Sequence, residues 1–113
     1  MRPRLILLPS LIALAGCQGG DRHAEAKALI ASRCAACHVV PGVPAAVGRV
    51  GPSLAAIADR RFIAGRFANN RATMVRWLLH PQAMVPGNGM PELGLSQPQA
   101  MAIADYLSTL DRP

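Results

Sequence analysis

Two thiols and an imidazole lie close together in the stretch Cys34-Ala35-Ala36-Cys37-His38. Thiols two residues apart can each add to one vinyl group of a porphyrin and form two thioether bonds. A histidine directly after the second thiol can then place its imidazole beneath the iron. A Cys-x-x-Cys-His stretch is typical of c-type haem attachment. The stretch therefore predicts one covalent haem c, bound through Cys34 and Cys37, with His38 as an iron ligand.

A Cys-x-x-Cys pair has two other common uses. A thioredoxin-like redox pair needs a βαβ context, and the sequence shows none. A structural zinc site needs further ligands, but no second Cys-x-x-Cys and no His-x-x-x-His follow downstream. A haem-free protein with a redox-active or zinc-binding pair remains the alternative from another class, and a colourless mature protein would favour it.

Haem iron held by one histidine keeps a sixth position open, and Met90 is the predicted ligand for it. It lies in the segment Pro86-Gly87-Asn88-Gly89-Met90-Pro91, where proline restricts the backbone and glycine allows close approach to a porphyrin. A thioether is a soft, neutral ligand that favours ferrous iron and raises the potential. Met84 is the nearest rival along the chain, and His23 and His80 are weaker ones.

The N-terminus has the pattern of an export signal. Arg2 and Arg4 precede an apolar run over residues 5–15, which is too short to span a bilayer. Leu14-Ala15-Gly16-Cys17 resembles a bacterial lipoprotein box, which implies cleavage before Cys17 and transfer of diacylglycerol to its thiol. The alternative is an ordinary signal peptide that is cut nearby.

Three regions follow from this pattern: a signal peptide (1–16), a lipidated tether (17–22) and one small domain (23–113). The domain is expected to be periplasmic and anchored to a membrane by the N-terminal lipid. The full chain has a formal net charge of +6, and it has no basic run, so nucleic acid is not an expected partner. One Trp, one Tyr and two Phe make a thin core, to which a buried porphyrin would add apolar volume.

Three stretches carry apolar residues at helical spacing. The first covers residues 23–33, with Asp21 as the expected N-cap, and it runs into the Cys-x-x-Cys-His motif. The second covers residues 73–80 and is expected to end at Pro81, which lacks the amide hydrogen that a helix interior needs. The third begins at Ser96, the expected N-cap, and a glutamine three positions later completes a capping box.

The segments between these helices are expected to be mostly irregular. Residues 54–61 are expected to form one or two short helical turns, residues 62–70 to be irregular, and residues 82–95 to form a loop rich in Pro and Gly. No β alternation is visible. Met74 and Met101 fall within helical patterns and are expected to fill the core.

The motifs CAACH, GPSL, PGNGMP and AIADYL follow one another in an order that resembles the class I, mitochondrial-type monohaem cytochromes c. The resemblance covers roughly residues 22 to 111, in a bacterial lipoprotein form. It implies an all-α fold in which three to four helices wrap around one covalent haem. It also implies that the first and last helices cross, with Ala26 and Ile30 where the family often has glycine and phenylalanine, and with Ile103 and Tyr106 meeting the first helix.

The resemblance also implies roles for individual residues. Pro52 matches the proline whose carbonyl accepts a hydrogen bond from the proximal imidazole, and Leu54 matches a residue that packs on the porphyrin. Arg60 falls where the family keeps an arginine near a propionate, although Arg61 could serve instead. Trp77 matches an aromatic residue near the distal face, and plain core packing is an equal alternative.

These features predict a one-electron carrier rather than an enzyme, in a membrane-associated respiratory or dehydrogenase chain. Expected partners are redox proteins, such as a dehydrogenase, an oxidase or a bc1-type complex, and the chain is expected to be a monomer or a complex subunit. The alternatives are the haem subunit of a larger dehydrogenase or oxidase, or a ligand-binding or peroxidatic haem protein. The sequence shows no distal His/Arg pair of the kind that peroxidatic chemistry would need.

Overall fold

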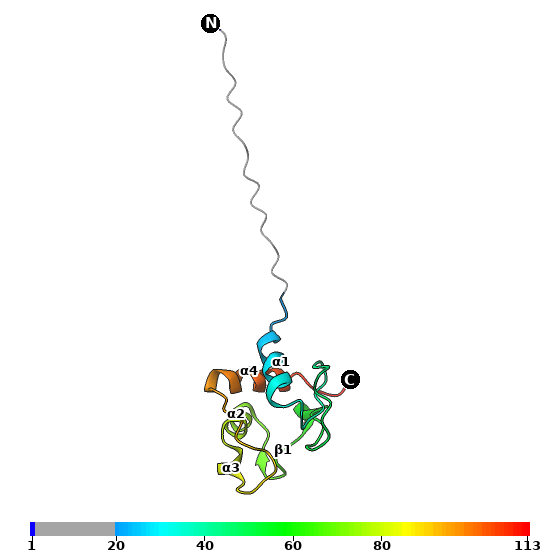
Figure 1. The fold of residues 1–113 in the computed structure, drawn as a ribbon, viewed down its shortest axis with the longest axis vertical. Coiled ribbons are helices and arrows are strands. Elements are labelled where there is room, and N and C mark those ends of the chain that lie inside the picture. The colour runs from blue at the N-terminus through cyan, green and yellow to red at the C-terminus, as the bar shows by residue number, and fades with distance from the viewer. Residues whose placement is uncertain (2–19) are drawn as a thin grey trace.

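The computed structural model describes Met1 and residues 20–113. The predicted lipid site at Cys17 and nearly all of the predicted signal peptide lie outside the described residues. The described part is mainly helical, which confirms the predicted all-α class (Figure 1). Its elements in chain order are α1 (Ala24–Arg33), the 3₁₀ helix η1 (Ile57–Asp59), β1 (Phe62–Ile63), β2 (Phe67–Ala68), α2 (Arg71–Leu79), α3 (Pro81–Met84) and α4 (Gln97–Leu107).

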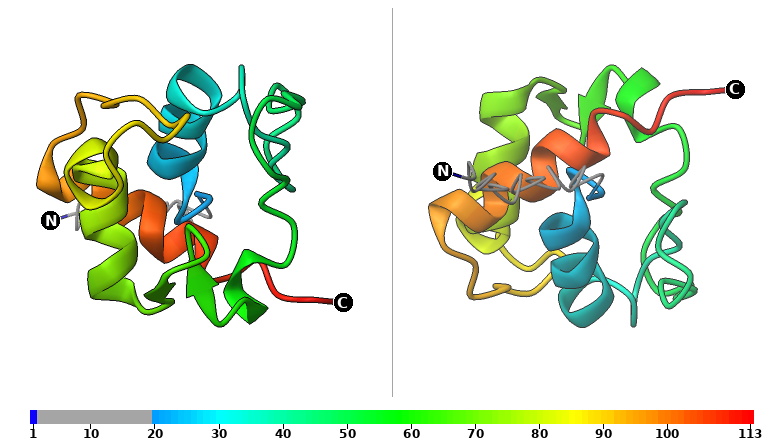
Figure 2. Two further views of the ribbon diagram at one scale, coloured as in Figure 1. Left: turned by 90° about the horizontal axis from the view of Figure 1, so that it is seen from below. Right: turned by 90° about the horizontal axis from the view of Figure 1, so that it is seen from above.

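The last helix is the centre of the fold. Figure 2 shows α4 crossing α1 and lying against α2, and these two helices are its main neighbours. Ala26 and Ile30 on α1 are buried, and so are Ala100 and Ile103 on α4. The predicted crossing of the first and last helices is therefore confirmed, with an alanine on each helix among the buried residues. Small side chains let two helices approach closely.

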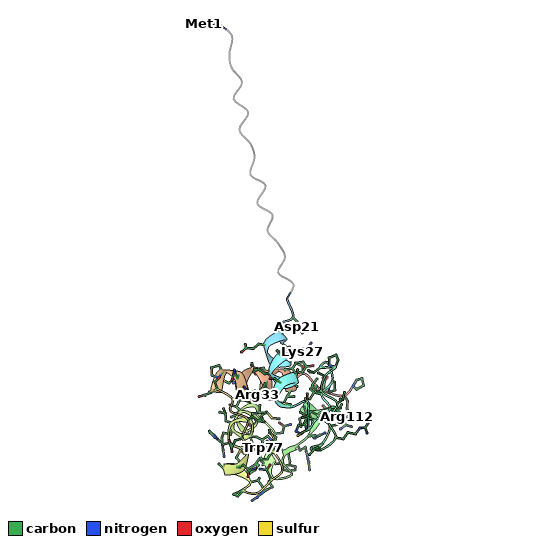
Figure 3. The ribbon with its side chains drawn as sticks, in the orientation of Figure 1. Met1, Asp21, Lys27, Arg33, Trp77 and Arg112 are labelled. Atoms are coloured by element: carbon green, nitrogen blue, oxygen red, sulfur yellow. The ribbon has the colours of Figure 1, made fainter. Side chains whose placement is uncertain are left out.

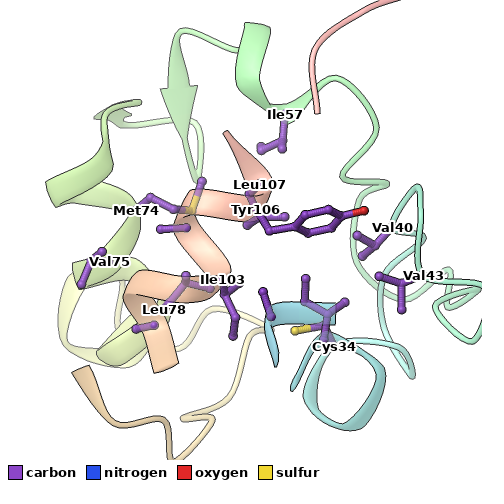
Figure 4. Packing of buried hydrophobic residues seen from close by; sticks show 14 of the residues in the cluster. Cys34, Val40, Val43, Ile57, Met74, Val75, Leu78, Ile103, Tyr106 and Leu107 are labelled. Atoms are coloured by element: carbon purple, nitrogen blue, oxygen red, sulfur yellow. The ribbon is translucent and has the colours of Figure 1, made fainter. Parts of the chain in front are cut away.

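Tyr106 on α4 fixes the loop that follows the haem motif. Its hydroxyl donates a hydrogen bond of 2.5 Å to the Pro41 carbonyl, and its ring lies 5.4 Å from the His23 ring. Figure 4 shows the hydroxyl directed toward the segment that carries Val40. Gly42 has a φ of 80°, and a Cβ there would come within 2.1 Å of the Tyr106 hydroxyl oxygen. Only glycine fits this close approach.

The start of α4 forms as the sequence predicts. The Ser96 hydroxyl accepts from the Gln99 amide, and the Gln99 side chain accepts from the Ser96 amide, which completes a capping box. The predicted N-cap of α1 is wrong by two residues, because His23 holds that position. The Asp21 carboxylate instead accepts from the His23 amide two residues on and pairs with Lys27, so it closes the turn that precedes the helix (Figure 3).

Residues 62–70 are not simply irregular, because β1 and β2 form a short antiparallel hairpin in which Ile63 faces Phe67. Ala64 and Gly65 both have positive φ and make the turn, closed by a bond from the Arg66 amide to the Ile63 carbonyl. Positive φ at both central positions suits the twist of a tight hairpin. Strands of two residues are too short to show an alternating pattern in the sequence.

Pro81 ends α2 as predicted, but the chain does not continue as a loop. It starts α3, because the fixed φ of proline suits the first position of a helix and its missing amide hydrogen is not needed there. His80 serves as the last cap of α2 and the first cap of α3. The predicted loop over residues 82–95 is therefore wrong in its first three residues, which belong to a short helix.

An ion pair joins α2 to α4. The Arg71 Nε and a terminal nitrogen of its guanidinium donate to the two oxygens of Asp105 at 2.7 and 3.1 Å. The hydrogen bond from Arg71 lowers the pKa of Asp105 below its ordinary value. Both side chains are about half exposed, so the pair adds little to the free energy of unfolding and chiefly fixes the orientation of the two helices.

Candidate haem site

A cavity of about 690 Å³ lies inside the domain. Its walls come from α1, α2, α4, β1 and the segments around residues 50–54 and 85–93. The walls are mostly apolar, and the volume falls within the range of cofactor pockets, about 300 to 1,000 Å³. Figure 4 shows Cys34, Ile103 and Leu78 arranged around this interior.

Every residue that the sequence nominated for the haem lines this cavity. These eight residues are Cys34, Cys37, His38, Pro52, Leu54, Arg60, Trp77 and Met90. The alternatives Arg61, Met84, His23 and His80 are absent from its lining. Met74, which was expected only to fill the core, does line the cavity from α2, so it is a rival of Met90 in space.

The two thiols are placed by the end of α1. The Cys34 amide still donates to the Ile30 carbonyl, and the Cys37 and His38 amides both donate back to the Cys34 carbonyl. This extra turn brings the three side chains to one side of the helix end, where all of them line the cavity. Burial raises the pKa of the Cys34 thiol to about 11, with a smaller effect from Cys37, so the group is a neutral thiol at pH 7.

The His38 ring is oriented by the main chain. Its Nδ1 lies 2.7 Å from the Pro52 carbonyl oxygen, which is the contact that the resemblance implied. A carbonyl can only accept, so Nδ1 carries the proton and the lone pair of Nε2 is free to bind a metal. A carbonyl partner of this kind holds the ring in one orientation and makes Nε2 a better electron-pair donor to a metal.

Gly51 is a site residue that sequence reasoning missed. A Cβ at this position would lie 2.5 Å from His38 Cε1 and 2.9 Å from Nδ1, well inside normal contact distance. The glycine therefore lets the backbone lie directly against the imidazole, on the residue before Pro52. Its place in the motif Gly-Pro-Ser-Leu was visible in the sequence, but its contact with His38 depends on the fold.

Two arginines line the cavity at its edge. A terminal nitrogen of Arg60 donates to the Ser53 carbonyl at 2.5 Å, which leaves other N–H groups of the guanidinium free for an anion. Arg61 instead lies over the Phe62 ring, 5.8 Å from its centre. Arg33, which the sequence did not nominate, donates to the Leu93 carbonyl and so joins α1 to the segment after Met90.

The donor set and the cavity fit a haem c. Two free thiols, one oriented imidazole and the thioethers of Met74 and Met90 line the same apolar space, with cations at its edge for propionates. Among the residues that the structure describes, no group of three or more His, Cys, Asp or Glu side chains could hold another metal ion. The zinc alternative therefore has no support in this part of the chain.

The model of the Cytochrome c family matches residues 23–111, and the chain belongs to this family. It is a class I monohaem cytochrome c, whose cofactor is covalent haem c and whose chemistry is electron transfer. It is 34% identical to cytochrome c2 iso-2 of Magnetospirillum molischianum over 90 residues, which cover 68% of this chain and 90% of that protein.

A second relative is a larger protein. The chain is 33% identical to cytochrome c oxidase subunit 2 of Bacillus sp. (strain PS3) over 90 residues, which cover 76% of this chain. The match spans only 25% of that subunit's length. The similarity therefore concerns about a quarter of that subunit and not the whole of it.

Proposed function

We propose that the protein is a one-electron carrier whose haem iron is bound by His38 Nε2 on one side and the Met90 sulfur on the other. The observation that carries the proposal is that both side chains line the same cavity as Cys34 and Cys37, whereas Met84 does not. Met74 also lines this cavity, but as a buried side chain of the regular helix α2 and not in the Gly-Met-Pro segment. An iron held by both His38 and Met90 would have no free site for a substrate, which would leave electron exchange as its function.

The bound haem supplies a one-electron couple between ferric and ferrous iron. The residues of the chain would keep the surroundings of the iron constant when the charge of the iron changes. The Pro52 carbonyl holds the His38 ring in one tautomer, and buried apolar side chains such as Leu78 and Ile103 exclude water from the cavity walls. A site that changes little between its two oxidation states exchanges electrons with little rearrangement.

The edge of the cavity offers a contact surface for a redox partner. Phe62 and Val50 line the cavity and are 52% and 83% exposed. The guanidinium groups of Arg60 and Arg61 lie beside this apolar edge. A small apolar contact with cations around it suits brief docking of an acidic partner, such as a dehydrogenase, an oxidase or a bc1-type complex.

The similarity to an oxidase subunit favours a second candidate function. In this alternative the chain is the haem-bearing subunit of a larger oxidase or dehydrogenase, and not a free shuttle. Purification from the native host distinguishes the two. A free carrier is expected to separate from larger complexes, whereas a subunit would remain in constant ratio with them through every step.

The expected optical behaviour tests the carrier proposal. The native protein should take up one electron reversibly, and its ferrous form should not bind carbon monoxide within the time of mixing, because the Met90 sulfur would hold the sixth position. A redox titration and a stopped-flow experiment measure both properties. Rapid carbon monoxide binding by the native ferrous protein would instead support a ligand-binding or peroxidatic function.

We also propose that the domain lies in the periplasm and is anchored to a membrane by a lipid attached to Cys17. The described part of the chain contains no helix long and apolar enough to cross a bilayer. The support for the anchor is the lipoprotein-like box Leu14-Ala15-Gly16-Cys17 after a short apolar run. Buried acyl chains add about 0.8 kcal/mol for each CH₂, so a lipid with two or more chains makes a stable anchor.

A Cys17→Ser variant is expected to leave the membrane fraction, because its hydroxyl cannot take the thioether-linked lipid. Fractionation of cells followed by detection of the protein measures this change, with the parent protein as the control. Export and haem attachment should stay unchanged if a nearby site is still cleaved. If the variant stays with the membrane to the same degree as the parent, a lipid on Cys17 is not the main anchor.

A further inference from the structure

Both main-chain polar groups of Met90 are held by amide side chains. The Met90 amide donates to the Asn88 side-chain oxygen at 2.6 Å, and the Met90 carbonyl accepts from Gln82 Nε2 at 2.7 Å. Both bonds are to side chains and not to another backbone. The position of the methionine is therefore fixed by one side chain of α3, Gln82, and one of its own segment, Asn88.

Gln82 reaches three positions of this segment. Besides the Met90 carbonyl, its Nε2 donates to the Asn88 carbonyl at 2.9 Å, and its Oε1 accepts from the Gly87 amide at 3.1 Å. The side-chain amide therefore uses both of its ends. Gly87 has a φ of 78°, and the segment contains a second glycine, so its backbone would otherwise be free to adopt many conformations.

Asn88 ties the same segment to α3. Its Nδ2 donates to the Pro81 and Val85 carbonyls at 2.9 and 2.7 Å, while its Oδ1 accepts from the Met90 amide. Pro81 is among the most deeply buried side chains of the domain. The network therefore runs from a buried anchor, through Asn88 and Gln82, to the backbone of Met90.

The far side of the segment is fixed separately. The Arg33 guanidinium at the end of α1 donates to the Leu93 carbonyl, and the Glu92 carboxylate accepts from the Gln82 amide at 3.2 Å. Figure 2 shows this segment, between α3 and α4, passing close to the end of α1. Met90 thus lies between two fixed points in a stretch with little regular structure.

We infer that Gln82 and Asn88 are positioning residues that hold the Met90 sulfur in the cavity independently of its bond to iron. The inference rests on the proposed ligation by Met90. A thioether binds ferric iron less strongly than ferrous iron. In the ferric protein the iron alone would hold the segment weakly, and the two amides keep the sulfur in reach until the next electron arrives.

The variant Gln82→Glu tests this role with almost no change in shape. One carboxylate oxygen can still accept from the Gly87 amide. The other oxygen replaces Nε2, so an acceptor instead of a donor then faces the carbonyl oxygens of Asn88 and Met90. A polar group that is unsatisfied or repelled in a partly buried place is costly. The ferric variant is expected to bind added imidazole at least about tenfold more tightly than the parent, because the Met90 segment opens more readily.

The matched control is Gln97→Glu, which makes the same chemical change at an exposed position in the first turn of α4. It should leave imidazole affinity unchanged. The second variant Asn88→Asp should act like Gln82→Glu, because it sets a carboxylate oxygen against the Pro81 and Val85 carbonyls. In both variants the methionine–iron charge-transfer band should be lost at a lower denaturant concentration than the helix. In the control the two denaturant concentrations should lie closer together.

The outcomes separate this inference from the ligand assignment. If Met90→Ala keeps the charge-transfer band, the ligation by Met90 is wrong, and the inference falls with it. If Met90→Ala loses the band while Gln82→Glu and Asn88→Asp bind imidazole as weakly as the parent, only the positioning role is wrong. The role would also be overturned if each variant lost as much free energy of unfolding as it gained in imidazole binding, because the whole fold and not the Met90 segment would then be weakened.

Discussion

Met90→Ala is expected to lose the methionine–iron charge-transfer band and to have a potential lower by on the order of 0.2 V, within the range of about 0.8 V that axial ligands span. A neutral thioether stabilises ferrous iron relative to ferric iron, so its loss favours the ferric state. The alanine cannot reach the iron, and water or an added ligand can then bind there. An optical redox titration of the variant and its parent measures both effects.

Two methionine variants are the controls for this experiment. Met84→Ala should keep the band and the potential, because Met84 is not part of the cavity lining. Met74→Ala removes a buried side chain that does line the cavity, so it should lower stability, by about 2 to 5 kcal/mol for a change of this kind, but keep the band. If Met74→Ala or Met84→Ala alone abolished the band, the sixth ligand would not be Met90.

The haem-free chain is expected not to keep a cooperative fold. Residual cavities in protein cores cost about 24 cal/mol for each Å³. If the observed volume of about 690 Å³ were one enclosed, dry cavity, it would cost about 17 kcal/mol. This exceeds the whole stability of an ordinary domain, about 5 to 15 kcal/mol, and even a third of it equals the stability of a marginal domain. The cofactor is therefore a structural part of the core.

Expression in cells without haem-attachment machinery provides the haem-free protein. Its far-UV circular dichroism and thermal unfolding can be compared with those of the haem-bearing protein from competent cells. We expect reduced helix content and a broad transition or none in the haem-free form. A sharp, cooperative transition with native helix content would show that side-chain repacking closes the cavity and that the haem adds little to folding.

Local sequence patterns predicted the features that depend on a few neighbouring residues. The capping box of Ser96 and Gln99 depends on residues three positions apart, and the stop at Pro81 depends on one missing amide hydrogen. The Cys-x-x-Cys-His motif likewise places its two thiols and its imidazole within five consecutive residues. The structure brings Cys34 and His38 to one cavity as that motif requires.

The resemblance implied the contact between His38 and Pro52 and the crossing of the first and last helices, but other features that depend on distant contacts were not predicted. The closeness of Gly51 to the His38 ring requires the loop after the motif to fold back, and no local pattern encodes it. Met74 is an ordinary apolar position of a helix in the sequence, and only the packing of α2 brings it to the cavity. The hydrogen bonds of Gln82 likewise depend on the path of residues 85–93, which reads in the sequence only as a loop.

The proposed carrier function depends most on a porphyrin joined to the chain by thioether bonds at Cys34 and Cys37. The most direct measurement is separation of the full protein, made in cells able to mature such cytochromes, on a denaturing gel that is then stained for haem. A stained band is expected at the position of the protein, because denaturation does not break thioether bonds. A protein band without haem stain would contradict it.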